Sequence, residues 1–326
     1  MLISKTPLRV SFVGGGTDIP WYYKKYGGAV VSTAINKYIY ITINTKFDHK
    51  IRVSYSKTEI VDKVHDLRHE LVREAMRLTK LDGGIEITSI SDIPSEGTGL
   101  GSSSTYTVGL LNALYAFKGK HVGAERLAHE ASKIEIVTLG KPVGKQDQYI
   151  ASYGGLQYMR FNKNDSVYID PIITNSRTKA RLQRNLLLLY TGLTRSSSTL
   201  LASQRAIVTT SPNKIKLMQK MADLATECKL VLEKGKIADF GTLLHENWML
   251  KRQLANGISI SEVDYWYKMA RKHGALGGKL CGAGGGGFLL LYAPYDKHKS
   301  ILNALKTLRP IGFELEPQGS KIIYVS

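Results

Sequence analysis

Residues 94–105 read PSEGTGLGSSST, and this glycine-serine loop decides the fold predicted for the chain. Its alternating glycines let the backbone take positive φ values and approach a ligand closely. Serines then stand at the start of a strongly helical segment, 105–117, where free N–H groups and the helix dipole attract anions. A turn with a serine cap would explain only one or two of these residues. We therefore expect a phosphate-binding loop made by Gly97, Gly99, Leu100, Gly101, Ser102, Ser103 and Ser104.

This loop differs from the common P-loop. No glycine-lysine pair in the chain is followed by Ser or Thr at the GxxxxGK[ST] spacing, which argues against the lysine-based NTPases. A hydroxyl at such a helix start can also bind Mg²⁺.

The segments around the loop predict an α+β protein with two domains. In the first half, residue type and periodicity predict strands at 7–13, 28–35, 37–44, 51–55, 84–90 and 155–161, and helices at 63–80, 105–117 and 124–139. In the second half they predict strands at 185–191, 276–281, 287–292, 312–316 and 321–325, and helices at 197–207, 213–234, 238–255, 261–273 and 297–308. The polar stretch 175–185 resembles a domain junction. We therefore expect an ATP-phosphate-binding domain at 1–175 and a second domain at 176–326, with a cleft between them.

Composition bounds the function. The formal net charge is +18, and a nucleic-acid-binding α+β protein is one interpretation of it. The basic residues are dispersed, however, and a positive field equally suits small anionic substrates, so we expect no specific nucleic-acid partner.

Two cysteines, Cys228 and Cys281, make neither a disulfide framework nor a CxxC site. With no signal-like start and no long apolar run, we expect a cytoplasmic protein without membrane contact.

A second glycine cluster, KLCGAGGGGFLLLY at 279–292, formally contains the GxGxxG pattern of dinucleotide-binding proteins. A strand-like segment follows it instead of a helix, and no acidic residue stands about 20 positions on, so that context is missing. A tight connection between two strands, packed against the first loop, is the better interpretation, and a plain hairpin turn is the alternative. We expect this connection, with Gly282, Gly284, Gly285 and Gly286, to line one nucleotide pocket together with the first loop, and the family resemblance described below implies that it supports the active site.

Two further segments carry carboxylates. In PLRVSFVGGGTD at 7–18, Thr17 and Asp18 beside a bare glycine backbone suit hydrogen bonds to sugar hydroxyls, although Asp18 could equally cap a helix that begins near Ile19. In GKPVGKQDQYIASYGG at 140–155, Asp147 could take a proton from a substrate hydroxyl or simply cap its helix.

The order of these four segments, from residue 7 to residue 292, resembles the small-molecule kinases that include galactokinase, homoserine kinase, mevalonate kinase and phosphomevalonate kinase. The resemblance implies a ribosomal-protein-S5-like N-terminal domain, a ferredoxin-like α/β-sandwich C-terminal domain and an active site in the cleft. It also implies ATP and Mg²⁺, a catalytic role for Asp147 and Arg9, and metal binding by Glu135 and by Ser103 or a neighbouring serine. PxxxxGLGSSS has one residue more than the commonest spacing, and Glu135 stands one residue further from Asp147.

Within that family, GGGTDIP, GGAVVSTAINKYIYITI and GKQDQYIASYGG look most like heptose 7-phosphate kinases, with fucokinases next. Such kinases phosphorylate the anomeric hydroxyl of D-glycero-D-manno-heptose 7-phosphate, giving the 1,7-bisphosphate for nucleotide-activated heptose synthesis. A fucokinase or galactokinase-like sugar 1-kinase is the alternative. We expect a monomer or homodimer. The substrate's own phosphate requires cations, and the candidates are Lys141, Lys145 and Arg195.

Overall fold

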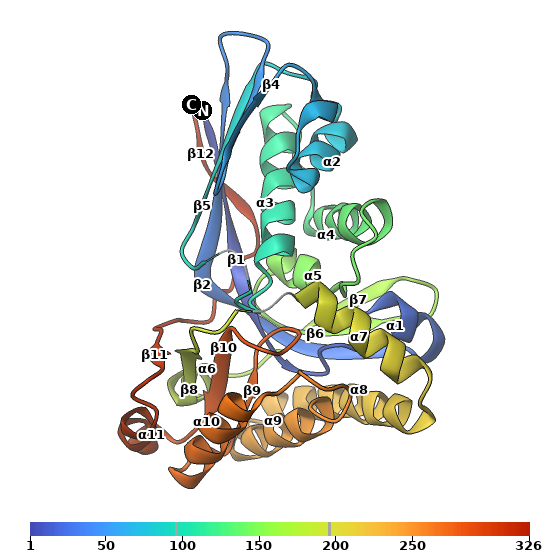
Figure 1. Ribbon diagram of the computed structural model, residues 1–326. Helices are drawn as coiled ribbons and strands as arrows, with labels where there is room; N and C mark the ends of the chain where they lie inside the picture. Colours follow the sequence, from blue (N-terminus) through green and yellow to red (C-terminus); the bar gives the residue numbers. More distant parts are fainter. Residues whose placement is uncertain (95–96, 195–196) are drawn as a thin grey trace.

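The computed structural model describes residues 1–94, 97–194 and 197–326, and it is built around two antiparallel-rich sheets (Figure 1). The larger sheet has eight strands, in the order β12-β1-β2-β5-β3-β4, with β6 on β2 and β7 on β6. Among the strand pairs of the described residues, only β3 and β5 are parallel. These strands are β1 (Leu2–Val13), β2 (Gly28–Thr45), β3 (Ile51–Ser54), β4 (Thr58–Val61), β5 (Ile85–Ser91), β6 (Leu156–Phe161), β7 (Val167–Pro171) and β12 (Lys321–Val325).

The long strand β2 joins the two parts of this sheet. Its first residues, Gly28–Thr33, pair with β6, and its last residues, Ile39–Thr45, pair with β5. The register against β1 shifts after Pro7, a residue that cannot donate a ladder hydrogen bond. Beyond this shift β1 is buried throughout, and the Arg9 N–H bonds to Leu100 O at 3.1 Å. The irregularity thus turns the strand toward the glycine-serine loop.

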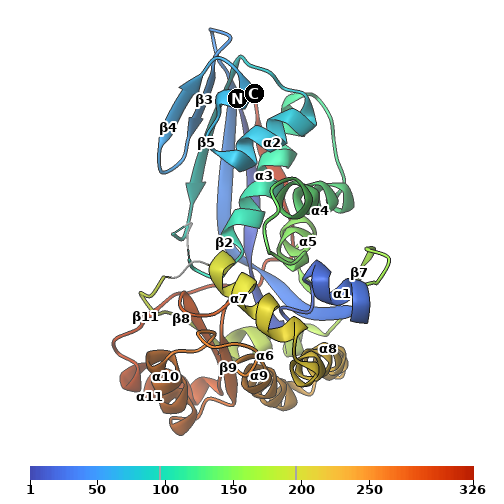
Figure 2. The same cartoon turned by 45° about the vertical axis from the view of Figure 1, so that its right-hand side comes forward.

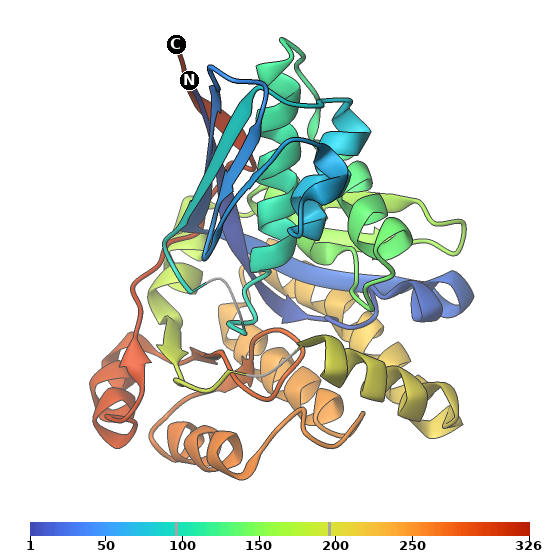
Figure 3. The ribbon, with the colours of Figure 1, turned by 45° about the horizontal axis from the view of Figure 1, so that its top comes forward.

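Helices cover one face of the sheet, with α3 at their centre (Figures 1 and 3). Because α3 is apolar on nearly every side, it packs both on β1 and β2 and beneath its neighbouring helices. The helices of this half are α1 (Pro20–Tyr26), α2 (Glu70–Thr79), α3 (Ser102–Phe117), α4 (Ala124–Ser132), the π-helix η2 (Lys133–Thr138) and α5 (Gln146–Tyr153), with a short 3₁₀ turn η1 at Val64–Asp66.

The second half of the chain forms a four-stranded antiparallel sheet in the order β11-β8-β10-β9. Its strands are β8 (Leu186–Tyr190), β9 (Gly277–Leu280), β10 (Phe288–Tyr292) and β11 (Arg309–Pro310). Its helices are α6 (Ser176–Asn185), α7 (Ser197–Thr209), α8 (Pro212–Glu233), α9 (Ile237–Lys251), α10 (Ser261–Lys272), the 3₁₀ turn η3 (Tyr295–Lys297) and α11 (His298–Ala304).

One apolar core connects the two halves. Phe240 of α9 lies edge-on to Phe12 of β1, with ring centroids 5.1 Å apart, and to Tyr292 of β10 at 5.0 Å. The chain then returns to its starting point, because β12 pairs with β1 and both termini lie side by side (Figure 2). In the described ranges, no helix combines the length and the apolar character needed to cross a bilayer.

The predicted α+β class with two sheets and their helices is confirmed, and several predicted elements need correction. The strands expected at 28–35 and 37–44 are one continuous strand. No strand forms at 312–316, where Leu315 makes only a single bridge to Ile35. The polar stretch 175–185 is largely helix, because the Asn175 side chain caps α6 by accepting from the Thr178 N–H at 2.8 Å. The boundary at 175/176 stays a prediction, and β12 belongs to the first sheet although it lies beyond that boundary.

Candidate active site

A cavity of about 720 Å³ lies where the two sheets meet. Its walls come from the end of β1, the glycine-serine loop, the start of α5, α7, the end of α9 and the connection between β9 and β10. Most of the residues predicted from the motifs line it, namely Arg9, Asp18, Gly97, Gly99, Gly101, Ser102, Ser103, Ser104, Glu135, Asp147, Gly282, Gly284 and Gly286. Residues far apart in sequence thus share one space.

The glycine-serine loop has the backbone that an anion cradle needs. Gly97, Gly99 and Gly101 have φ values of 68°, 75° and 81°, which side chains disfavour. Gly101 precedes the first residue of α3, and no side chain caps that helix end. The first N–H groups of α3 therefore have no intrahelical partner and are available to an anion. Ser103 is exposed, whereas Ser102 and Ser104 are buried.

The second glycine segment packs directly against the first. A Cβ atom on Gly99 would stand 2.4 Å from Cys281 O, and one on Gly287 would stand 2.3 Å from Thr98 O. Because β9 and β10 are paired antiparallel strands, this segment is a strand-to-strand connection, as predicted. The glycines here are needed for close backbone contact with the loop that carries the serines.

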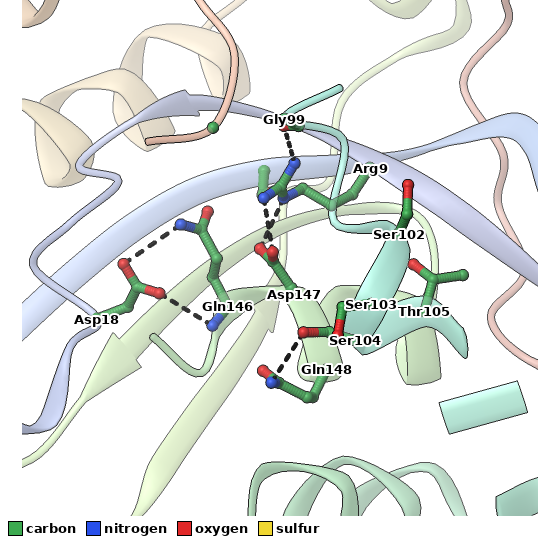
Figure 4. A network of polar contacts seen from close by, with 12 residues as sticks. Arg9, Asp18, Gly99, Ser102, Ser103, Ser104, Thr105, Gln146, Asp147 and Gln148 are labelled. Atoms are coloured by element: carbon green, nitrogen blue, oxygen red, sulfur yellow. Dashed lines mark hydrogen bonds and ion pairs between the residues drawn. The ribbon is translucent and has the colours of Figure 1, made fainter. Parts of the chain in front are cut away.

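Arg9 and Asp147 form a two-pronged ion pair in the cavity wall (Figure 4). The Arg9 Nε donates to Asp147 Oδ1 at 2.7 Å, and Nη2 donates to Oδ2 at 2.6 Å. The remaining arm, Nη1, donates to Gly99 O at 2.6 Å and so fixes the guanidinium to the loop. The Arg9 side chain is 4% exposed and that of Asp147 is 20% exposed, so the carboxylate keeps access to the cavity.

Glu135 and the serines form a second polar cluster beside this ion pair. Ser103 Oγ donates to Glu135 Oε2 at 3.2 Å, and Gln148 Nε2 donates to Glu135 Oε1 at 2.9 Å and to Ser104 Oγ at 3.0 Å. Figure 4 shows the Gln148–Ser104 contact. Burial raises the pKa of the Glu135 carboxyl, and its position on a π-helix is one that functional sites often use.

Asp18 is held as a buried acceptor at the other side of the cavity. It accepts from the Gly16 N–H at 2.9 Å, and from the Gln146 N–H at 3.1 Å and Nε2 at 3.2 Å (Figure 4). Burial raises the pKa of this carboxyl, and repulsion from Asp147 adds to the rise. Asp18 does not cap α1, because the residue at that helix start is Ile19. The arrangement suits hydrogen bonds to hydroxyl groups.

Among the described residues, three predicted substrate contacts, Thr17, Lys145 and Lys141, do not line this cavity. Thr17 is fully buried, and its hydroxyl donates to Gly14 O and Ala29 O at 2.8 and 2.9 Å. Lys145 points away to Asp165, with Nζ 2.8 Å from Oδ1. Arg195 lies outside the described residues. Lys141 lies 2.7 Å from Glu70 and does not line the cavity.

Sequence reasoning missed two lysines in the cavity wall. Lys251 ends α9 and donates to Gly282 O at 2.7 Å, and Lys279 lies on β9. Lys279 is 1% exposed, and its side chain forms no hydrogen bond or ion pair with any residue that the structure describes. Burial lowers the pKa of Lys251 to about 8, and burial together with repulsion by Lys251 holds the pKa of Lys279 well below its usual value. The only sequence signal was that Lys279 opens the second glycine segment.

Unpaired polar atoms mark the acceptor side of the cavity. Within the described ranges, buried atoms that lack a hydrogen-bond partner include Ser11 Oγ, Gln146 Oε1 and Gln204 Nε2, and all three residues line the cavity. Buried polar groups are normally paired, so unpaired ones in a cavity indicate a ligand with hydroxyl groups. Ser11 and Gln146 lie in the motifs at 7–18 and 140–155 but were predicted no role, and Gln204 lies outside every predicted motif.

Comparison with known proteins gives concordant matches. The family model described as GHMP kinases N terminal domain matches residues 67–155, and that described as GHMP kinases C terminal matches residues 229–309. A D-glycero-alpha-D-manno-heptose 7-phosphate kinase from Campylobacter jejuni is 30% identical over 93% of this chain and 92% of its own length. An L-fucokinase/L-fucose-1-P guanylyltransferase from Bacteroides fragilis is 26% identical over 89% of this chain and 34% of its own length.

A solved structure matches across the whole chain. The crystal structure of a D-glycero-D-manno-heptose 1-phosphate kinase from Bacteroides thetaiotaomicron has a TM-score of 0.82 and 26% sequence identity, and the match covers 100% of both chains. Both sheets and the cavity between them therefore belong to one shared fold.

Proposed function

Because this chain belongs to the GHMP kinase family and is therefore an ATP-dependent kinase, we propose that its acceptor is a sugar that already carries a phosphate group. The family models and the relatives confirm the resemblance drawn from the four sequence motifs. The specific acceptor that we propose is D-glycero-D-manno-heptose 7-phosphate, with transfer to the anomeric C1 hydroxyl. The observation that carries the proposal is the Arg9–Asp147 pair, set between the glycine-serine loop and Asp18.

In the proposed reaction the acceptor hydroxyl lies at Asp147, and the γ-phosphate of ATP lies at the glycine-serine loop. Asp147 accepts or steers the hydroxyl proton, while Arg9 holds the carboxylate in place through two hydrogen bonds. The backbone N–H groups at the start of α3 hold the phosphates. Lys279 and Lys251 face the same space and stabilise the charge of the transferring phosphoryl group.

The residues on the loop side fit a magnesium ion. Ser103 and Glu135 offer two hard oxygen donors that lie 3.2 Å apart. Among the described residues no group of three His, Cys, Asp or Glu side chains could hold a metal, which agrees with Mg²⁺ sites that use one or two protein oxygens plus substrate phosphates. When bound, the ion would neutralise charge on the β and γ phosphates. Glu135 and Ser103 would hold it, with Gln148 fixing the orientation of Glu135.

The names of two relatives support a heptose phosphate but differ in where its phosphate stands. The Campylobacter protein is called a heptose 7-phosphate kinase, and the Bacteroides structure is called a heptose 1-phosphate kinase. We favour the 7-phosphate because that relative has the higher identity, 30% against 26%.

An ADP-release assay over a panel of acceptors tests this proposal. The panel is heptose 7-phosphate, heptose 1-phosphate, fucose, galactose and mevalonate, each with MgATP. We expect the highest kcat/KM for heptose 7-phosphate and, by phosphorus NMR, an anomeric phosphate in the product. Preference for fucose, the acceptor named for the Bacteroides fragilis relative, would replace the heptose assignment and leave the kinase class intact.

A further inference from the structure

A second hollow opens beside the active-site cavity. Its volume is about 530 Å³, and it adjoins the cavity because both are lined by Ile19 and Val143. Its walls come from α1, from the segment before α5 and from α7, which runs close to α1 (Figures 1 and 3). We call it the basic trough, after the four cations that line it, Lys24, Lys25, Lys141 and Arg205.

The charge of the basic trough is only partly compensated. None of its described lining residues is acidic. Lys141 lies 2.7 Å from Glu70, and Lys24 lies 3.6 Å from Asp165, and both carboxylates stand outside the lining. Arg205 is exposed and has no hydrogen bond or ion pair from its side chain to any described residue. Cations gathered without their own counter-ions favour the binding of an anion.

We propose that the basic trough binds the phosphate group that the acceptor already carries, an inference that rests on the proposed function. Ile19 follows Asp18 directly in the chain, and Val143 precedes Gly144, where a Cβ atom would stand 1.9 Å from Asp18 Oδ2. The trough therefore adjoins the cavity next to Asp18. A sugar that bonds to Asp18 and places its reacting hydroxyl at Asp147 has its other end at the trough.

The chemistry of the acceptor requires this separation. In a heptose 7-phosphate the anomeric hydroxyl and the phosphate stand at opposite ends of the carbon chain. The γ-phosphate of ATP and the phosphate of the acceptor must therefore bind at different places. Lys251 and Lys279 interact electrostatically with Arg9 and Asp18, at the reacting end. Lys145 is bonded to Asp165. Among the described residues that line the cavity or the trough, the other cations are those of the trough. The planar guanidinium of Arg205 matches a phosphate in two-pronged geometry.

The double variant Lys25→Ala/Arg205→Ala tests the proposal, because it leaves the Lys141–Glu70 and Lys24–Asp165 pairs in place. We expect the KM for heptose 7-phosphate to rise by about tenfold or more, since charge-assisted bonds to phosphate are lost. The KM for ATP should not change. The KM for the unphosphorylated heptose, which is high in the wild type, should not change either.

A matched control removes the same amount of charge elsewhere. Lys216→Ala/Lys220→Ala takes two exposed cations from α8, outside the trough, and should leave the KM for heptose 7-phosphate within about twofold. An equal rise in this control would mean that general charge attraction, and not a site, governs the acceptor. A rise of equal size for the unphosphorylated heptose would also overturn the proposal.

Calorimetric binding of heptose 7-phosphate without ATP separates this inference from the proposed function. If the wild type binds the compound, the double variant binds it more weakly and neither transfers phosphate, the trough stands and the function fails. If the wild type turns it over and the KM of the double variant is unchanged, the function stands and the trough fails. If the wild type does not bind it, both fail.

Discussion

Two pairs of charged residues face the same cavity and are built in opposite ways. Arg9 and Asp147 carry opposite charges and satisfy each other through two hydrogen bonds of 2.6 and 2.7 Å. Lys251 and Lys279 carry like charges, and Lys279 has no partner in the described part of the chain. The charges of the first pair compensate each other without a ligand, whereas the positive charge of the second pair is compensated only when an anion binds.

The difference separates positioning from charge stabilisation. A paired carboxylate whose guanidinium partner is also bonded to Gly99 O has a fixed direction, which suits steering one proton. Buried, uncompensated ammonium groups favour any state that brings negative charge to them, and the transferring phosphoryl group is such a state. Each prediction below changes one pair and leaves the other.

The largest effect is expected from Asp147→Asn. Proton transfer by a positioned side chain contributes roughly 10²–10⁴-fold, so kcat should fall by about that factor. The amide keeps the shape of the side chain, and ATP binds on the loop side, so the affinity for a fluorescent ATP analogue should stay within about twofold. An Asn variant with wild-type kcat would remove Asp147 from the catalytic step.

Lys279→Met should lower kcat by about 10²-fold, because removing one group that stabilises developing charge typically costs that much. Initial rates at saturating ATP and acceptor measure the effect. Lys216→Met, on the exposed face of α8, is the control and should keep its rate. If kcat were unchanged in Lys279→Met and only the KM for ATP rose, the lysine would serve ground-state binding instead.

Local signals explain why the loops could be predicted and these lysines could not. A glycine-serine run before a helix predicts a tight loop from the local sequence alone, and a glycine run before a strand does the same. Lys251 is the basic last residue of an amphipathic helix, a position that usually faces solvent, and its burial depends on how α9 packs on β1 and β9. The Arg9–Asp147 contact joins residues 138 positions apart and followed only from the family resemblance.

Two residues predicted to contact the substrate face away from the cavity, and they show that a motif does not predict the direction of a side chain. Thr17 and Lys145 stand in the right motifs, but backbone oxygens hold the Thr17 hydroxyl, and Asp165 holds the Lys145 ammonium. Sequence spacing brings a residue near a site, whereas the direction of its side chain depends on partners from other segments. Asp165 belongs to the turn between β6 and β7, and β7 was not predicted as a strand.

The two pairs should also respond oppositely in stability. Asp147→Asn leaves the Arg9 charge buried without its partner, so we expect the free energy of unfolding to fall by about 1–3 kcal/mol, less than for a fully buried pair because Asp147 is partly exposed. Lys279→Met replaces a buried amine that has no polar side-chain partner with an apolar side chain, and it should raise the free energy of unfolding by about 1–3 kcal/mol. Urea unfolding at pH 7, followed by tryptophan fluorescence, gives both values. Changes of the same sign would contradict the contrast between the pairs.

The smallest effect concerns the pH dependence set by Lys251. Burial lowers its pKa to about 8, so the ammonium is charged below that pH and neutral above it. Only the charged form attracts phosphate, and kcat/KM reports ionisation of the free enzyme, so kcat/KM should fall at most about tenfold between pH 7 and 9. Arg9, Asp18, Asp147 and Cys281 act on the same lysine, and Lys251→Met removes its ionisation together with its repulsion of Lys279. In this variant kcat/KM should be lower than in the wild type and should no longer fall near pH 8. If the fall persists in Lys251→Met but disappears in Lys279→Met, Lys279 is the group that titrates, and the anion is bound mainly by the lysine whose side chain has no polar partner among the described residues.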